Sequence, residues 1–457
     1  MTTMMTMTTK EIPVAKGLPL IGNLVFLSNN SQPLLQFLVK NYQKLGPLYK
    51  VRVLGKDLTI FAGPEANMFV TQKGMHHFTN REVYDELAKE FGESLVITLD
   101  GNPHRRMRKI VDQFLNSAAI AQYVKPMIQT TFDFTKNWQI GQRIDVFDSL
   151  RKIILNQFTS ALLSCTSTDD FLEDISSCLT TVVKVMLGQK PRSVLRKPTY
   201  LTAKNRAFGF IQALIDKRRK TGQVTDEPDV LDFLLSVKAD DGQALTEEEI
   251  FTCIFIIILG GLDTLVNTSL FLIYEILKHP EIYEKIMTEI STVFDNRIPN
   301  VEDIKNMKVL RGAGMESLRI YQGGIVAVRY VQHPFDYKDY RVESGQTIYF
   351  ASSVSHFLPE FFPNPYTFDV ERYAPPRQEH KQPGAFAPFF LGQHMCAGAR
   401  LSEIQLMLTV GTILYAVQPQ LDAPNYTMKT VLFTDKSSVL TAKNKCYIRP
   451  TRKITLN

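Results

Sequence analysis

The sequence predicts a mainly α-helical protein with small β-sheets, and three observations lead to this prediction. Apolar residues recur at helical spacing through several long segments, the longest of which runs from Leu245 to Lys278. Only short segments alternate between apolar and polar residues as strands do, for example 48–61. A loop rich in aromatic residues and glycine carries Cys396 and precedes a further apolar helical segment, 399–417.

Composition indicates a globular chain with a sizeable core. The chain has 457 residues, of which 44% are hydrophobic and 21% are charged. A net charge of +6 is mild and does not indicate a nucleic-acid partner. Five cysteines without a CxxC spacing argue against a disulfide framework or a zinc site. We therefore expect a reducing compartment, the cytoplasm.

The chain divides into a short tail and one domain. Residues 1–11 are rich in Thr and Met and lack the apolar run of a signal peptide, so we expect a disordered tail, with a targeting segment as the alternative. The rest, 12–457, is predicted to be a single domain. A helix is expected over 32–45, strands over 48–61, and mostly helices over 120–220.

The segment Leu245–Lys278 reads as one helix of about 50 Å at ~1.5 Å per residue. Thr246 and Glu249 form a capping-box pattern at its start, and Pro280 ends it. Asp263 is the only charged residue between 250 and 274, so a transmembrane helix is the alternative interpretation. The polar and glycine residues of 260–264 favour a helix through the core of a large globular protein.

Cys396 is the candidate metal ligand. It precedes a helical segment, and the unpaired N–H groups at a helix N-terminus favour a thiolate, which binds soft metals such as iron. Gly392 lets the loop turn, Gly398 lets a flat group approach the backbone, and Phe389 can shield the sulfur from water. The alternative is a buried, inert cysteine.

The spacing Phe389-x-x-Gly392-x-His394-x-Cys396-x-Gly398 resembles the cysteine-ligand loop of the cytochrome P-450 family. The resemblance implies that Cys396 is the axial thiolate of haem b (iron protoporphyrin IX) and that His394 bonds a haem propionate. It implies the cytochrome P-450 fold in a soluble form, with a long central I helix crossing a buried haem.

The pentad Gly260-Gly261-Leu262-Asp263-Thr264 is similar to the oxygen-site signature of the family's I helix. This implies that Asp263 and Thr264 are catalytic and organise proton delivery. An alternative for Thr264 is that its hydroxyl simply bonds back to the carbonyl of Gly260.

His104 and Arg108, four apart on one helix face, resemble the pair that reaches the haem propionates. Arg329 stands on an expected strand where the family often has another propionate-binding arginine. Three more residues resemble the family's buried charge network, which we interpret as structural: Glu316, Arg319 and Arg372.

The resemblance implies a haem-thiolate monooxygenase that hydroxylates a lipophilic small molecule. It would use O2 and two electrons from a separate ferredoxin, flavodoxin or similar reductase, without nucleic acid and without an integral membrane anchor. The basic residues expected to dock that reductase are Arg105, Arg106, Lys109 and Arg400. The alternatives are a peroxide-dependent or isomerising haem-thiolate enzyme, and a non-enzymatic haem or ligand-binding protein.

Overall fold

The computed structural model describes residues 10–18, 22–23, 25, 31–72, 74–222 and 228–454, which fall into two compact units. Unit 1 comprises the described residues of 1–85, 324–367 and 378–396, and unit 2 those of 86–323, 368–377 and 397–457. Residues 1–9 of the expected tail lie outside the described residues. Lys10, also assigned to that tail, pairs with Asp339 at 2.7 Å.

Unit 1 contains the main sheet, whose strand order is β1-β2-β8-β5-β3. Pairing is antiparallel except between β2 and β8, which run parallel. The strands are β1 (Leu48–Val53), β2 (Lys56–Ala62), β3 (Phe78–Thr79), β5 (Ala327–Val331) and β8 (Thr347–Ala351), with a separate hairpin of β6 (Phe335–Tyr337) and β7 (Tyr340–Val342). Its helices are α1 (Ser31–Leu45), α2 (Gly63–Thr71) and the short η2 (Met75–His77), η5 (Ser352–Phe357) and η7 (Glu379–Lys381).

The core of unit 1 is built from the inward residues of these strands. Phe61 and Ile348 are fully buried, and Phe78 packs edge-on against Phe350 with ring centroids 5.0 Å apart. Alternating burial along β5 places every second residue in this core, as expected of a strand with one covered face. The predicted helix at 32–45 and the strands at 48–61 are confirmed.

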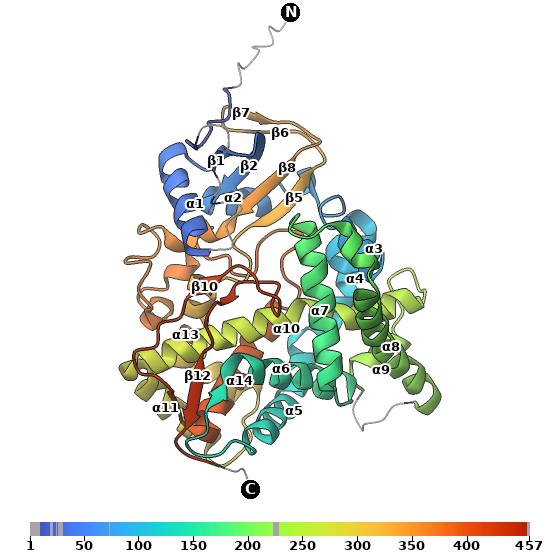
Figure 1. Ribbon diagram of the computed structural model, residues 1–457, viewed down its shortest axis with the longest axis vertical. Helices are drawn as coiled ribbons and strands as arrows, with labels where there is room; N and C mark the ends of the chain where they lie inside the picture. Colours follow the sequence, from blue (N-terminus) through green and yellow to red (C-terminus); the bar gives the residue numbers. More distant parts are fainter. Residues whose placement is uncertain are drawn as a thin grey trace, which may run out of the picture. The chain divides into compact units, whose positions relative to one another are not determined.

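Unit 2 is mainly helical, and the prediction of a mainly α protein with small sheets is confirmed (Figure 1). Its helices are α3 (Asp85–Phe91), α4 (Gly101–Phe114), α5 (Ser117–Thr135), α6 (Val146–Leu163), α7 (Asp169–Met186), α8 (Pro198–Thr221), α9 (Val230–Ser236), α10 (Glu247–Lys278), α11 (Pro280–Phe294), α12 (Val301–Asn306), α13 (Lys308–Ile320) and α14 (Ala399–Val417), with short η3 (Val96–Thr98), η4 (Arg192–Arg196) and η6 (Val370–Tyr373). Its short strands are β4 (Ile144–Asp145), β9 (Pro419–Leu421), β10 (Thr430–Val431), β11 (Thr441–Ala442) and β12 (Tyr447–Pro450).

Helix α10 is the core helix of unit 2. Its 32 residues span about 48 Å at ~1.5 Å per residue, and the capping box of Thr246 and Glu249 starts it. It packs against α6, α8, α11, α13 and α14 (Figure 1). By length and composition it is the one helix among the described residues that could cross a membrane. Burial of side chains such as Phe255 and Phe271 against neighbouring helices is the packing of a core helix instead.

Candidate active site

The loop that ends at Cys396 is held by its own backbone. The N–H of Cys396 donates to the carbonyl of Phe389 at 3.0 Å, and the N–H of Met395 donates to Gly392 at 3.1 Å. Gly392 has a φ of +82°, and a Cβ there would lie 2.8 Å from the carbonyl oxygen of Val70. Only glycine suits this position. The side chain of Cys396 is exposed at the end of this closed loop, so it is not an inert core cysteine.

Two buried polar side chains of unit 1 fix the segment that leads into this loop, and the sequence did not point to either. His356 on η5 is fully buried and accepts the N–H of Ala387 through Nε2 at 2.8 Å. Asn67 on α2 donates to the carbonyl of Gly384 at 2.9 Å. A single His or Asn without a motif carries no sequence signal, so only the tertiary structure identifies these supports.

Unit 1 also carries two of the predicted cationic residues. Arg329 on β5 is buried, and its guanidinium donates to the carbonyl of Val328 at 2.8 Å. His394 lies on the cysteine loop and is half-buried. These two residues and Cys396 therefore belong to one compact unit.

In unit 2, helix α4 carries the predicted pair His104 and Arg108. His104 is buried, whereas Arg108 is partly exposed and pairs with Asp112 at 2.9 Å. Pro103 lies in the first turn of α4.

The basic residues of α4 predicted for docking are largely paired within unit 2. Arg106 bonds to Glu249 on α10 and lies 3.3 Å from Asp241. Lys109 pairs with Asp240, and Arg105 bonds to Asn102. These partners neutralise Arg106 and Lys109, which reduces the positive charge that the two residues present to another protein.

One stripe of α10 is left uncovered in the middle of the buried helix. Gly260 is exposed, and Ile257, Gly261 and Thr264, at helical spacing around it, are partly exposed. A Cβ built on Gly260 would meet no atom within 4 Å, so there is open space next to this turn. The helix backbone is therefore accessible from this side.

The acid and the alcohol of α10 point to different partners. The hydroxyl of Thr264 donates to the carbonyls of Gly260 at 2.8 Å and Gly261 at 3.2 Å, which is the back-bonded geometry that the sequence left as an alternative. Asp263 is 2% exposed and accepts from Ser438, through the backbone N–H at 2.8 Å and the hydroxyl at 2.6 Å. Burial raises the pKa of the Asp263 carboxyl, and the bonds from Ser438 oppose that shift.

Glu316, Arg319 and Arg372 lie together in the interior of unit 2. The Glu316 carboxylate accepts a two-pronged bond from Arg319 at 2.8 Å and 2.8 Å, and one from Arg372 at 3.1 Å. Tyr373 donates to it at 2.7 Å, and the N–H of Asp369 at 3.1 Å. Burial raises the pKa of Tyr373 well above its usual value, so the phenol stays a donor. The tyrosine is an additional member of the network that sequence reasoning did not assign.

Haem is the cofactor that the sequence resemblance implies, and the residues present fit it. A haem supplies four equatorial nitrogen ligands itself, so the protein has to add one soft axial ligand, and a single exposed thiol is sufficient. Open space beside Gly260 leaves room for a flat ring or a small molecule at the backbone of α10. Buried or half-buried cationic side chains suit the two carboxylates of such a group.

Comparison with known proteins places these features in a family. Residues 12–443 match the model of the cytochrome P450 family. A Mycobacterium tuberculosis protein named as cytochrome P450 number 139 is 28% identical, covering 86% of this chain and 92% of the relative. Cyclooctat-9-en-7-ol 5-monooxygenase of Streptomyces melanosporofaciens is 26% identical over 74% of each chain. The crystal structure of the cytochrome P450DA heme domain superposes with a TM-score of 0.85 at 19% identity, covering 97% of this chain and 98% of that one.

Replacing Glu316 tests the buried network. Glu316→Gln leaves Arg319 and Arg372 buried without a carboxylate, so we expect the free energy of unfolding to fall by about 3–5 kcal/mol. Tyr373→Phe removes one hydrogen bond to the carboxylate, so we expect a smaller loss of about 1.5–3 kcal/mol. Urea unfolding followed by circular dichroism measures both.

The matched control is Glu302→Gln on α12, where the carboxylate is exposed and pairs only with Lys305. That change should stay within about 0.5 kcal/mol. Equal losses for Glu316→Gln and Glu302→Gln would show that the network does not hold unit 2 together.

Proposed function

We propose that this chain, which belongs to the cytochrome P450 family, hydroxylates a lipophilic small molecule with O2 and two electrons from a separate redox partner. The chain is a cytochrome P450-type monooxygenase, an oxidoreductase that incorporates molecular oxygen. The observation that carries the proposal is the exposed Cys396 thiol at the end of a closed loop. A cytoplasmic location, with its reducing conditions, suits a thiol in this position.

When bound, haem b supplies the oxygen-activating chemistry. In this proposal the Cys396 thiolate would bind the haem iron, and Phe389 would shield the sulfur from water. Gly392 and Gly398 let the loop pass close to the ring. The residues proposed to bond the two propionates are His104, Arg108, Arg329 and His394.

Thr264, on the uncovered side of α10, and the buried Asp263 next to it in the chain are proposed to deliver protons. The hydroxyl of Thr264 donates to Gly260, but its oxygen retains lone pairs that accept a hydrogen bond from water or substrate. It can therefore hold a proton source in place without losing its own bond. Burial raises the pKa of Asp263, which makes its carboxylate a better proton acceptor than an exposed aspartate.

An apolar substrate is supported by aromatic side chains on α3, α8 and α10. Phe208 packs on Phe251 with ring centroids 4.8 Å apart and on Phe255 at 5.6 Å. Phe91 adds a further ring 4.9 Å from Phe255. Phe91 and Phe255 are fully buried behind this cluster, so we propose that the partly exposed Phe208 and Phe251 favour lipophilic molecules. The protein can be titrated with a cyclic alcohol such as cyclooctat-9-en-7-ol and with a long-chain fatty acid. Monitoring binding by the haem absorption spectrum would compare these two classes of substrate.

We propose that the redox partner docks near the start of α14. In this proposal the partner contributes an acidic face, and this chain contributes basic residues. A cavity of about 360 Å³ in unit 2 is lined by Lys305, Arg311 and Arg400 together with Glu403 and apolar side chains. Arg400 has no ion-pair partner among the residues that the structure describes, and Arg311 lies 3.8 Å from Glu403. These cations extend the docking surface predicted from the sequence and replace the contribution of the paired Arg106.

Replacing the candidate ligand tests the cofactor assignment. In Cys396→Ala the reduced, carbon monoxide-bound protein should lose the strongly red-shifted absorption band of a thiolate-ligated haem, because no thiolate is left to ligate the iron. Absorption spectra of the purified protein measure this. Cys165→Ala, which removes a half-buried thiol from unit 2, should keep the band. Retention of the band in Cys396→Ala would refute the assignment.

Replacing Thr264 tests proton delivery. Thr264→Ala should keep the thiolate-type spectrum but divert electrons to hydrogen peroxide, lowering product formed per electron pair by about tenfold or more. Thr264→Ser, which keeps the hydroxyl, should restore most of the coupling. Full coupling in Thr264→Ala would remove the proposed role. Turnover by added peroxide without any electron donor would support the peroxide-dependent alternative instead.

Reversing charge tests the docking surface. The double variant Arg311→Glu, Arg400→Glu should slow reduction by an acidic ferredoxin about tenfold at low salt and flatten its salt dependence. Stopped-flow reduction rates at several ionic strengths measure this. Lys220→Glu, at the exposed end of α8, serves as the control with one reversed charge elsewhere. Unchanged rates in the double variant would place the partner on another surface.

A further inference from the structure

The turn 434–439, between β10 and β11, holds the acid of α10. Ser438 gives Asp263 two hydrogen bonds, and both end on the same carboxylate oxygen, Oδ2. One helical turn further along, Asn267 donates to the hydroxyl of Ser437 at 2.9 Å. Two consecutive serines of the turn are thus bound to two residues on one face of α10.

The turn is closed by its own backbone and by one neighbouring residue. The N–H of Thr434 donates to the carbonyl of Ser437 at 2.9 Å, and the N–H of Lys436 donates to the hydroxyl of Thr434 at 3.2 Å. Just after it, the N–H of Leu440 donates to Gly323 at 3.1 Å. These bonds hold the backbone on both sides of Ser438.

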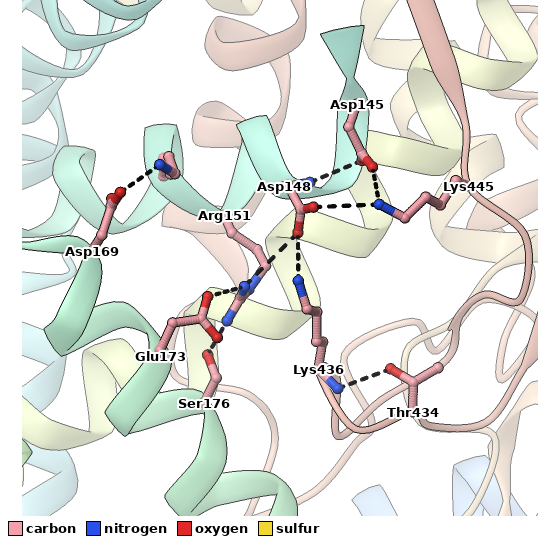
Figure 2. A network of polar contacts seen from close by, with 10 residues as sticks. Asp145, Asp148, Arg151, Asp169, Glu173, Ser176, Thr434, Lys436 and Lys445 are labelled. Carbon is pink, nitrogen blue, oxygen red and sulfur yellow. Dashed lines mark hydrogen bonds and ion pairs between the residues drawn. The ribbon is translucent and has the colours of Figure 1, made fainter. Parts of the chain in front are cut away.

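Ion pairs then fix the turn to α6 and α7. Lys436 lies 3.2 Å from Asp148, at the start of α6 (Figure 2). Asp435 pairs with Lys184 on α7, and its carbonyl accepts the hydroxyl of Thr180 at 3.4 Å. Asp148 also lies 3.8 Å from Lys445 in the segment after the turn (Figure 2). The turn is therefore held from three helices.

Beneath these pairs lies the buried Arg151, which ties α6 to α7. Its guanidinium bonds to Glu173 and to the hydroxyl of Ser176, each at 2.8 Å, and lies 4.0 Å from Asp148 (Figure 2). The side chain is 2% exposed, so removing one of its partners would leave a buried charge poorly compensated. Helices α6 and α7, which both contact the turn, are thus linked to each other.

We propose that Ser438 is a positioning residue for Asp263: its N–H and hydroxyl hold Oδ2, so that Oδ1 is presented in one direction for proton exchange. The inference rests on the proposed role of Asp263 in proton delivery. In this arrangement the serine hydroxyl keeps its own proton. A proton from water enters at Oδ1 and leaves from Oδ1, and Oδ2 remains bound to the turn throughout.

A carboxylate held through one oxygen by two donors cannot rotate about its side-chain bond without breaking both hydrogen bonds. Such orientation matters because proton transfer requires hydrogen-bond geometry between donor and acceptor. A merely structural serine would stabilise the turn but would have no effect on the fate of electrons in turnover. The two roles therefore differ in what a substitution changes.

The experiment compares Ser438→Ala with Ser438→Thr, using enzyme whose carbon monoxide spectrum shows an intact haem site. Ser438→Ala removes the hydroxyl donor and should lower product formed per electron pair by about three- to tenfold, with a larger solvent deuterium isotope effect on kcat. Ser438→Thr keeps a hydroxyl and should restore coupling to within about twofold of the wild type. Ser236→Ala, an exposed serine on α9, is the control.

A second measurement is independent of turnover. Hydrogen exchange of the Ser438 amide in the purified protein should be faster in Asp263→Ala than in the wild type, because its acceptor is gone. Unchanged exchange there, or full coupling in Ser438→Ala alongside a loss of coupling in Asp263→Asn, would overturn the inference and leave the proposed role of Asp263 intact. Full coupling in Asp263→Asn would overturn that role and the inference together.

Discussion

Unit 2 is built around the burial of α10. A 32-residue helix this apolar has to cover most of its surface, and α6, α8, α11, α13 and α14 do so. The exception is the stripe around Gly260 and Thr264, where the covering helices leave the backbone accessible. Because the surroundings are packed and apolar, polar groups at this stripe interact strongly with whatever binds there. Packing and chemistry thus depend on the same helix.

Burial removes water from the charged groups of unit 2, so their hydrogen-bond partners determine how well each charge is compensated. Glu316 and Arg319 are fully buried, and a buried charge is tolerated only when every member of its network is satisfied. Glu316 receives bonds from two arginines, a tyrosine and a backbone N–H, so its charge is well compensated. Asp263 is nearly as buried but has only the two donors of Ser438. The first carboxylate is therefore the hydrogen-bonded centre of a structural network, while burial raises the pKa of the second.

Unit 1 differs from unit 2 in that its candidate functional side chain, Cys396, is exposed rather than buried. Cys396 is exposed, yet the loop before it is closed by hydrogen bonds between its own residues. Behind the loop, His356 binds a single backbone N–H and Asn67 a carbonyl. Such buried polar contacts give the backbone one conformation. An exposed thiol on a loop held in this way suits the metal-ligand role proposed for Cys396, because the loop fixes the position of the sulfur.

Sequence patterns were sufficient to locate the main helices and the ligand loop. The period of apolar residues and the capping box of Thr246 predicted α10, and the spacing of residues from Phe389 to Gly398 identified Cys396 as the candidate ligand. Local patterns suffice there because caps, turns and motif spacing involve residues close together in the chain.

Tertiary packing, by contrast, brought Ser438 to Asp263, 175 residues apart, and His356 to Ala387, 31 residues apart. It also neutralised Arg106 with Glu249, which the basic pattern of α4 did not predict. These outcomes depend on how packed elements meet, and a lone serine or histidine carries no pattern that would indicate its partner.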